Sequence, residues 1–72
     1  MSGRLTQYDK RQLRLARHRL AAALYQCDLA LDPERIDPDR RFRCMFAASY
    51  AVQATTLLDQ ADRRLLRRGA AS

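Results

Sequence analysis

The sequence predicts an all-α protein, an antiparallel two-helix hairpin with coiled-coil-like packing, and three observations predict it. Two long stretches are rich in alanine, leucine and arginine, which favour helix, and contain neither glycine nor proline. Both prolines, Pro33 and Pro38, lie in the short acidic segment between these stretches. Apolar residues recur at alternating steps of three and four, as in a packed helical seam. A short linker makes two long helices antiparallel neighbours, so we expect one domain over residues 1–72.

The first helix is expected over residues 7–31. Thr6 followed by Asp9 fits a capping box, with Asp in place of the more common Glu, and this pair predicts that the helix begins near Gln7. No glycine or proline follows until Pro33. A helix of this length would span about 37 Å.

Apolar side chains fall on two separate lines of this helix at about 100° per residue. The first line carries Leu13, Ala16, Leu20, Ala23, Leu24, Cys27 and Leu31. The second line, roughly 160° away, carries Tyr8, Leu15, Ala22 and Leu29, with Tyr25 at its edge. Two apolar lines need two packing neighbours to bury them, and the chain itself provides one neighbour, the second helix. We therefore expect a partner-binding surface at the second line, although the pattern leaves open which line faces inward.

The linker is expected at residues 32–37, where a short turn begins at Asp32. Proline disfavours helical geometry in the residue before it, so Asp37 should lie outside the second helix as its N-cap. Ile36 is the only apolar residue between the two prolines and should plug the end of the core.

The second helix is expected over residues 38–68, with Gly69 ending it as a C′ glycine and short tails at both ends of the chain. Its seam residues recur at steps of three and four: Phe46, Ala47, Tyr50, Ala51, Ala54, Leu57, Leu58, Ala61 and Leu65. The alanines in this seam should let the first helix approach closely. The outer side of this helix mixes polar and apolar residues, so it predicts a partner-binding surface less clearly than the second line of the first helix does.

A chain of 72 residues builds only a marginal core, so association, disulfides or a metal would be its usual supports. Cys27 and Cys44 are interpreted as buried, reduced thiols, with a disulfide between them as the less favoured alternative. Together with the single His18 they do not make a zinc site, and we expect no metal or cofactor. The longest apolar run, residues 20–25, is too short for a membrane span, which predicts a cytoplasmic protein.

The net charge of +6 and the isoelectric point near 10.4 leave nucleic acid, a membrane surface or an acidic protein as partners. An antiparallel hairpin gathers most arginines at the pole where the first helix begins and the second ends. This basic pole includes Arg11, Arg14, Arg17, Arg63, Arg64, Arg67 and Arg68. Acidic residues concentrate at the linker pole. A small nucleic-acid-binding regulator that uses the basic pole is the alternative functional hypothesis.

We expect no enzymatic activity and no catalytic residues. The sequence has no glycine-rich phosphate loop, and His18 lies among arginines without a serine or cysteine at helical spacing. The acidic residues cluster around expected helix starts, where capping accounts for them.

Residues 19–31 contain the pattern Arg-Leu-x-Ala-Ala-Leu-x-x-Cys-x-x-x-Leu, and the second half continues with Pro38-Asp39, then Phe42, then a helix rich in small residues ending at Leu57-Leu58. This arrangement resembles the small two-helix co-chaperones of type III secretion needle subunits over roughly residues 13–60. The resemblance implies a hairpin that does no chemistry. It would bind a helical-repeat chaperone in the bacterial cytoplasm, and the pair would keep the needle subunit from polymerising before export.

The first functional hypothesis is therefore a protein-interaction module whose partner is a helical protein, with a needle-subunit chaperone suspected. Self-association of two hairpins into a four-helix bundle through the second line is the homo-oligomeric form of the same idea.

Overall fold

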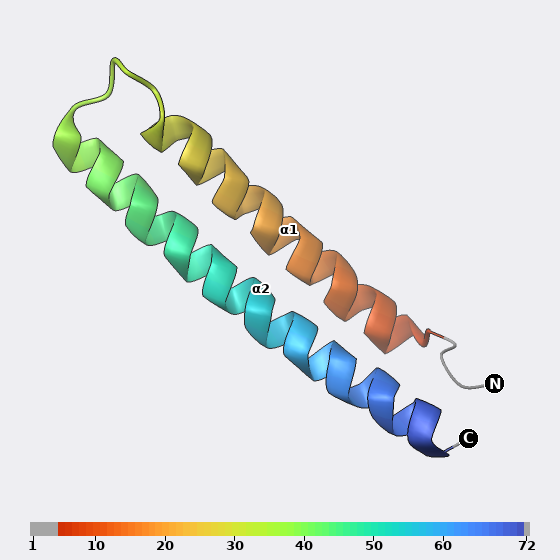
Figure 1. Cartoon of the computed structure of the whole chain (residues 1–72). Helices are drawn as coiled ribbons and strands as arrows, with labels where there is room; N and C mark the ends of the chain where they lie inside the picture. The colour runs from red at the N-terminus through yellow and green to blue at the C-terminus, as the bar shows by residue number, and fades with distance from the viewer. Residues whose placement is uncertain (1–4, 72) are drawn as a thin grey trace.

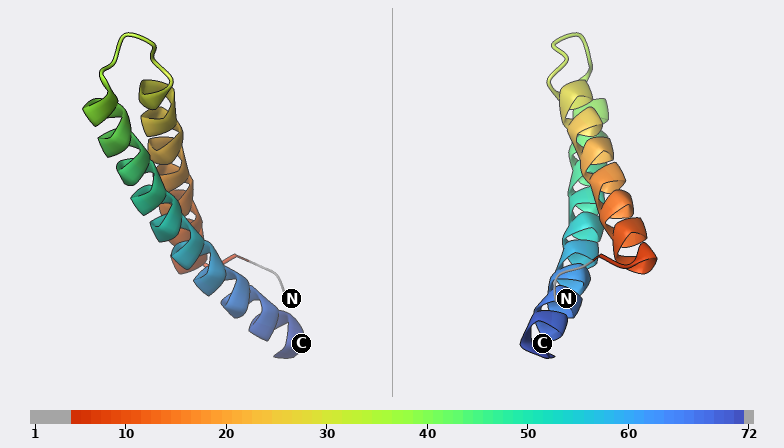
Figure 2. Two further views of the ribbon diagram at one scale, coloured as in Figure 1. Left: turned by 60° about the vertical axis from the view of Figure 1, so that its left-hand side comes forward. Right: turned by 90° about the vertical axis from the view of Figure 1, so that its right-hand side faces the viewer.

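The computed structural model describes residues 5–71, and side chains over residues 5–68. It consists of two α-helices, α1 (Gln7–Ala30) and α2 (Asp37–Ala71), and this described part contains no strand. The helices lie side by side and antiparallel, and α2 continues beyond the start of α1 (Figures 1 and 2). The molecule is a rod of 54 × 14 × 14 Å. The predicted all-α helical hairpin is confirmed.

The start of α1 is fixed by the predicted capping box. The Thr6 hydroxyl accepts a hydrogen bond from the Asp9 backbone N–H at 3.1 Å, and the Asp9 carboxylate accepts one from the Thr6 backbone N–H at 3.1 Å. Two of the backbone donors that a helix start leaves unpaired are thereby satisfied. The helix ends at Ala30, one residue earlier than expected, with Leu31 as its C-cap.

The linker pole differs from the expectation in two ways. The Ile36 carbonyl accepts hydrogen bonds from the backbone N–H groups of Asp39 and Arg40, so Asp37 is the first helical residue of α2 and not its N-cap. Pro38 then falls in the first turn, where a missing N–H costs nothing. Ile36 itself is 65% exposed and does not plug the core. The Arg40 side chain closes this end, because its guanidinium donates to the carbonyls of Asp32 and Pro33, both at 3.1 Å.

The end of α2 also differs from the expectation. Gly69 does not terminate the helix, which continues to Ala71. A helical glycine costs only about 1 kcal/mol relative to alanine, and the two residues that follow are alanines. Residues 1–4 and 72, which belong to the expected tails, lie outside the described part of the chain.

The core is a line of small residues spaced by seven. Ala47, Ala54 and Ala61 of α2 are buried, and Ala16 of α1 is completely buried. Alanine side chains let two helix backbones approach closely, as the sequence analysis expects for α2.

On α1, the inward line runs along the edge of the first predicted line that is nearer to the second, and it shares Ala16 and Ala23 with the first line. The members of the inward line are spaced by seven residues: Asp9, Ala16, Ala23 and Ala30, of which the first two are buried and the last two half-buried. Leu20, Leu24 and Leu31 of the predicted first line are 43%, 68% and 78% exposed, so that line as a whole is not the core. A seam of alanines covers only a narrow strip of the facing helix, and large side chains on either side of it stay in solvent.

The interpretation of the cysteines as buried is wrong. Cys27 and Cys44 are both free and both exposed. Cys27 belongs to the first predicted line, beside the leucines that the narrow seam leaves uncovered.

Candidate protein-interaction site

The predicted partner-binding line of α1 lies on one flank of the hairpin. Tyr8, Leu15, Ala22 and Leu29 each precede a member of the inward line by one residue, which places them about 100° away from it. Tyr8 is 51% and Leu15 is 38% exposed, whereas Ala22 and Leu29 are half-buried. Tyr25, at the edge of the line, is exposed. The five predicted residues therefore share one side of α1, and burial of their line increases toward the linker.

This flank is hollowed where α1 meets α2. A hollow of about 360 Å³ is lined by residues of both helices: Leu15, Arg19, Val52, Gln53, Thr56, Leu57 and Gln60. We call it the interhelical groove. Its apolar walls come from Leu15 on one helix and from Val52 and Leu57 on the other. A groove with apolar walls between two helices is a typical binding site for an amphipathic helix of a partner.

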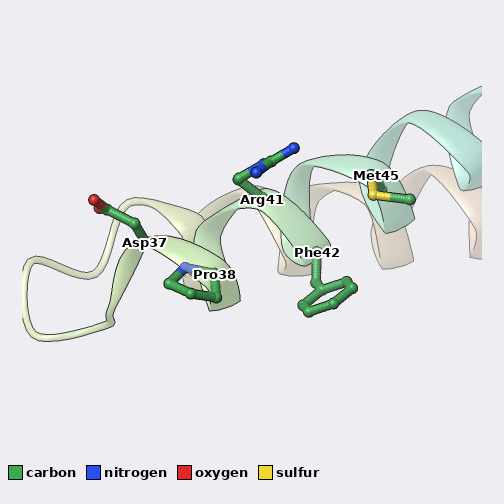
Figure 3. A pocket seen from close by; sticks show the side chains of 5 residues that line it. All are labelled: Asp37, Pro38, Arg41, Phe42 and Met45. Carbon is green, nitrogen blue, oxygen red and sulfur yellow. The ribbon is translucent and has the colours of Figure 1, made fainter.

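A second hollow, of about 340 Å³, lies on α2 next to the linker and is lined by Asp37, Pro38, Arg41, Phe42 and Met45 (Figure 3). Pro38 and Phe42 project from the same side of the helix in this view. Phe42 and Met45 are 55% and 65% exposed.

This surface is not among the sites predicted from the sequence. The signal that identifies it is a second apolar line on α2, outside the seam, formed by Pro38, Phe42, Met45 and Val52 at steps of four, three and seven. Polar residues interrupt this line, which is why the outer side of α2 reads as mixed.

The basic pole contains a buried charge cluster that sequence reasoning missed. The Asp9 side chain is fully buried, and its carboxylate pairs with two guanidinium groups of α2. The Arg64 Nε lies 3.3 Å from Asp9 Oδ1, and Arg68 Nη2 binds Oδ2. The Arg64 guanidinium also lies 4.4 Å from the centre of the Tyr8 ring, in cation–π geometry.

The capping box and the two arginines hold Asp9 in its charged form. The Thr6 backbone N–H is the main cause that lowers the pKa of Asp9 from 3.8 to about 2. Burial raises this pKa, and hydrogen bonds from the Thr6 side chain, Arg64 and Arg68 lower it further. The signal available in the sequence was position, because Asp9 precedes Ala16 by seven residues and so falls on the inward line.

These contacts change the character of the basic pole. Arg64 and Arg68 are bound to Asp9, and Arg63 pairs with Asp59 at 3.1 Å. The remaining members of the predicted set are exposed: Arg11, Arg14, Arg17 and Arg67. The basic pole is therefore partly a structural feature that fastens α2 to the start of α1.

The described residues contain no group of three or more histidine, cysteine or acidic side chains placed to hold a metal ion. Among these residues no helix has both the length and the apolar character that a bilayer crossing requires.

Comparisons with protein-family models, with curated proteins and with solved structures give no match to this chain.

Proposed function

We propose that this chain is a non-enzymatic interaction module that binds a helical protein along the flank formed by the second line of α1 and the interhelical groove. The observation that carries the proposal is the difference in burial between small and large apolar residues on α1. Ala16 is completely buried, while its neighbour Leu15 is 38% exposed and lines the groove. The two helices pack against each other through small residues, and large apolar side chains remain available to a partner.

The proposed biological role is that of a co-chaperone. In this role the hairpin binds the helical-repeat chaperone of a type III secretion needle subunit and helps to prevent premature polymerisation of that subunit. Two features support the role: the antiparallel two-helix architecture that the resemblance implies, and an apolar flank long enough to follow a partner helix over several turns. The protein would act in the cytoplasm, before export.

The test is binding of the purified chain to a needle-subunit chaperone from the same organism, followed by isothermal titration calorimetry. Leu15→Asp together with Leu29→Asp should weaken binding by at least about 30-fold, because burying an unpaired carboxylate in an apolar contact is costly. The matched control is Leu24→Asp, which makes the same chemical change at a leucine that is 68% exposed on the opposite side of α1.

The control should bind within about twofold of the unmodified chain. Unchanged binding of the Leu15→Asp, Leu29→Asp variant would show that this flank is not the interface. If the unmodified chain does not bind the chaperone at all, the co-chaperone role is wrong.

A further inference from the structure

The interhelical groove lies in a basic environment that contains no carboxylate among its lining residues. Arg19 is the one charged residue of the lining. One turn beyond Gln60, on the same side of α2, comes Arg64, whose guanidinium covers the Tyr8 ring. Arg67 follows three residues later and is exposed.

Helical spacing places Tyr8, Arg64 and Arg67 in line with groove-lining residues of their own helices, beyond the end of the groove itself. On α1, Tyr8, Leu15 and Arg19 follow steps of seven and four. On α2, Gln53, Leu57, Gln60, Arg64 and Arg67 follow steps of four and three. Such steps keep side chains on one side of a helix.

Asp9, Asp59 and Asp62 are the acidic residues of this half of the rod, and Asp62 lies roughly 160° around α2 from Gln60, away from the groove. Asp9 is buried beneath Arg64 and Arg68, and Asp59 pairs with Arg63. Asp59 follows Val52 by seven residues and so lies at the outer edge of the groove, where its carboxylate pairs with Arg63 at 3.1 Å. The groove therefore combines apolar walls with the cationic side chains of Arg19 and, farther along α2, Arg67, while the carboxylate at its outer edge is already paired with Arg63.

We propose that the occupant of the interhelical groove is an acidic amphipathic helix. Its apolar side chains would pack on Leu15, Val52 and Leu57, and its glutamate or aspartate side chains would pair with Arg19 and Arg67. This inference rests on the proposed function and adds the chemical class of the partner segment. Complementary charge along the borders selects such a helix over neutral or basic helices of equal apolar character.

The test uses two synthetic amphipathic peptides of about six helical turns that share one leucine stripe. One peptide carries glutamate at the positions flanking the stripe, and the other carries lysine at the same positions. Affinities are measured by fluorescence anisotropy at about 50 mM and about 300 mM salt, because surface charge pairing is screened at the higher concentration. The glutamate peptide should bind at least about tenfold more tightly at low salt, and the difference should shrink at high salt.

Two charge-reversing variants separate the groove from the overall positive charge of the chain. Arg19→Glu and the exposed Arg67→Glu should each weaken binding of the glutamate peptide by about tenfold. Arg17→Glu makes the same change in net charge at an exposed residue, and this residue lies roughly 160° around α1 from Leu15. Arg17→Glu should change the affinity by less than about twofold.

Each other outcome has a distinct meaning. Equal losses in all three variants would show that net charge, not the groove, attracts the peptide, and would overturn the proposal. If both peptides bind equally well and Leu15→Asp abolishes both, the interaction module stands and the acidic partner is wrong. If neither peptide binds, the groove does not accept a helix, and both the acidic partner and the proposed use of this flank fail.

Discussion

Asp9 occupies a position at which the repeat of α1 would otherwise place a small apolar residue. It precedes Ala16 by seven residues, is fully buried, and bonds to Thr6 of its own helix and to Arg64 and Arg68 of the other. A buried carboxylate with these partners is satisfied only when the start of α1 lies beside the last turns of α2. Asp9 therefore couples helix initiation to the register of the hairpin.

This coupling predicts a pH dependence of stability. The pKa of Asp9 is about 2 in the folded chain and 3.8 in its ordinary, unfolded setting. Because the folded pKa is the lower one, the charged carboxylate contributes stability at pH values above 3.8, and this contribution is lost as the pH falls through the folded pKa. The free energy of unfolding should decrease between about pH 5 and pH 2.

Urea denaturation at a series of pH values measures this effect. Asp9→Asn removes the titrating group and should flatten the dependence in that window. Asp59→Asn, which alters a solvent-exposed pair with Arg63, is the control and should retain the slope. A slope that is the same in Asp9→Asn as in the unmodified chain would contradict the assigned role of Asp9.

At the scale of the helices, the contact between α1 and α2 depends on alanines that stand at every seventh position. Ala54 is completely buried at the middle of α2. A larger side chain there would push the helices apart and force neighbouring side chains into strained rotamers, because packed interiors have little free volume.

Ala54→Leu should therefore destabilise the hairpin by about 1–3 kcal/mol, although leucine is the more hydrophobic residue. The control is Ala48→Leu, an exposed position on the same helix, where the change should stay within about 0.5 kcal/mol. Chemical denaturation followed by circular dichroism gives both values. A stabilised Ala54→Leu variant would mean that the interface has more space than the alanine line indicates.

The elements themselves could be predicted from the sequence because their signals are local. The proline-containing linker, the Thr6 and Asp9 capping box and the alanines of α2 each follow from residues within a few positions of one another. The side chains of α1 that face inward could not be predicted in the same way. A helical projection shows where apolar residues gather, but the width of the covered strip depends on the size of the facing side chains, and alanines cover little.

Contacts between distant residues explain the other differences. The pairing of Asp9 with Arg68 joins residues 59 positions apart and depends on the register of the two helices. Arg40 closes the linker pole in place of Ile36 because its guanidinium reaches two carbonyls of the turn. The sequence shows which residues could take part in such contacts. The packing and register of the two helices determine which of these residues pair.

At the scale of the whole molecule, the hairpin has a small core and extensive apolar surface. Within residues 5–68, the fully buried positions are alanines and one aspartate, while leucines, aromatics and Met45 remain exposed on both flanks and on the outer side of α2. A chain of this size gains stability from any partner that binds only its folded form. This balance is what we expect of a module that completes its packing against another protein.

The contrast between Leu15 and Ala16 is the most direct test of an alanine core flanked by leucines that are available to a partner. Thermal unfolding followed by circular dichroism compares Leu15→Asp with Ala16→Asp, two adjacent substitutions that introduce the same side chain. Ala16→Asp should unfold the hairpin or lower its melting temperature strongly, because it buries an unpaired carboxylate in the alanine seam, whereas Leu15→Asp should melt close to the unmodified chain. A Leu15→Asp variant that unfolds while Ala16→Asp remains folded would show that the leucine line is the core, and that no apolar flank is left for a partner.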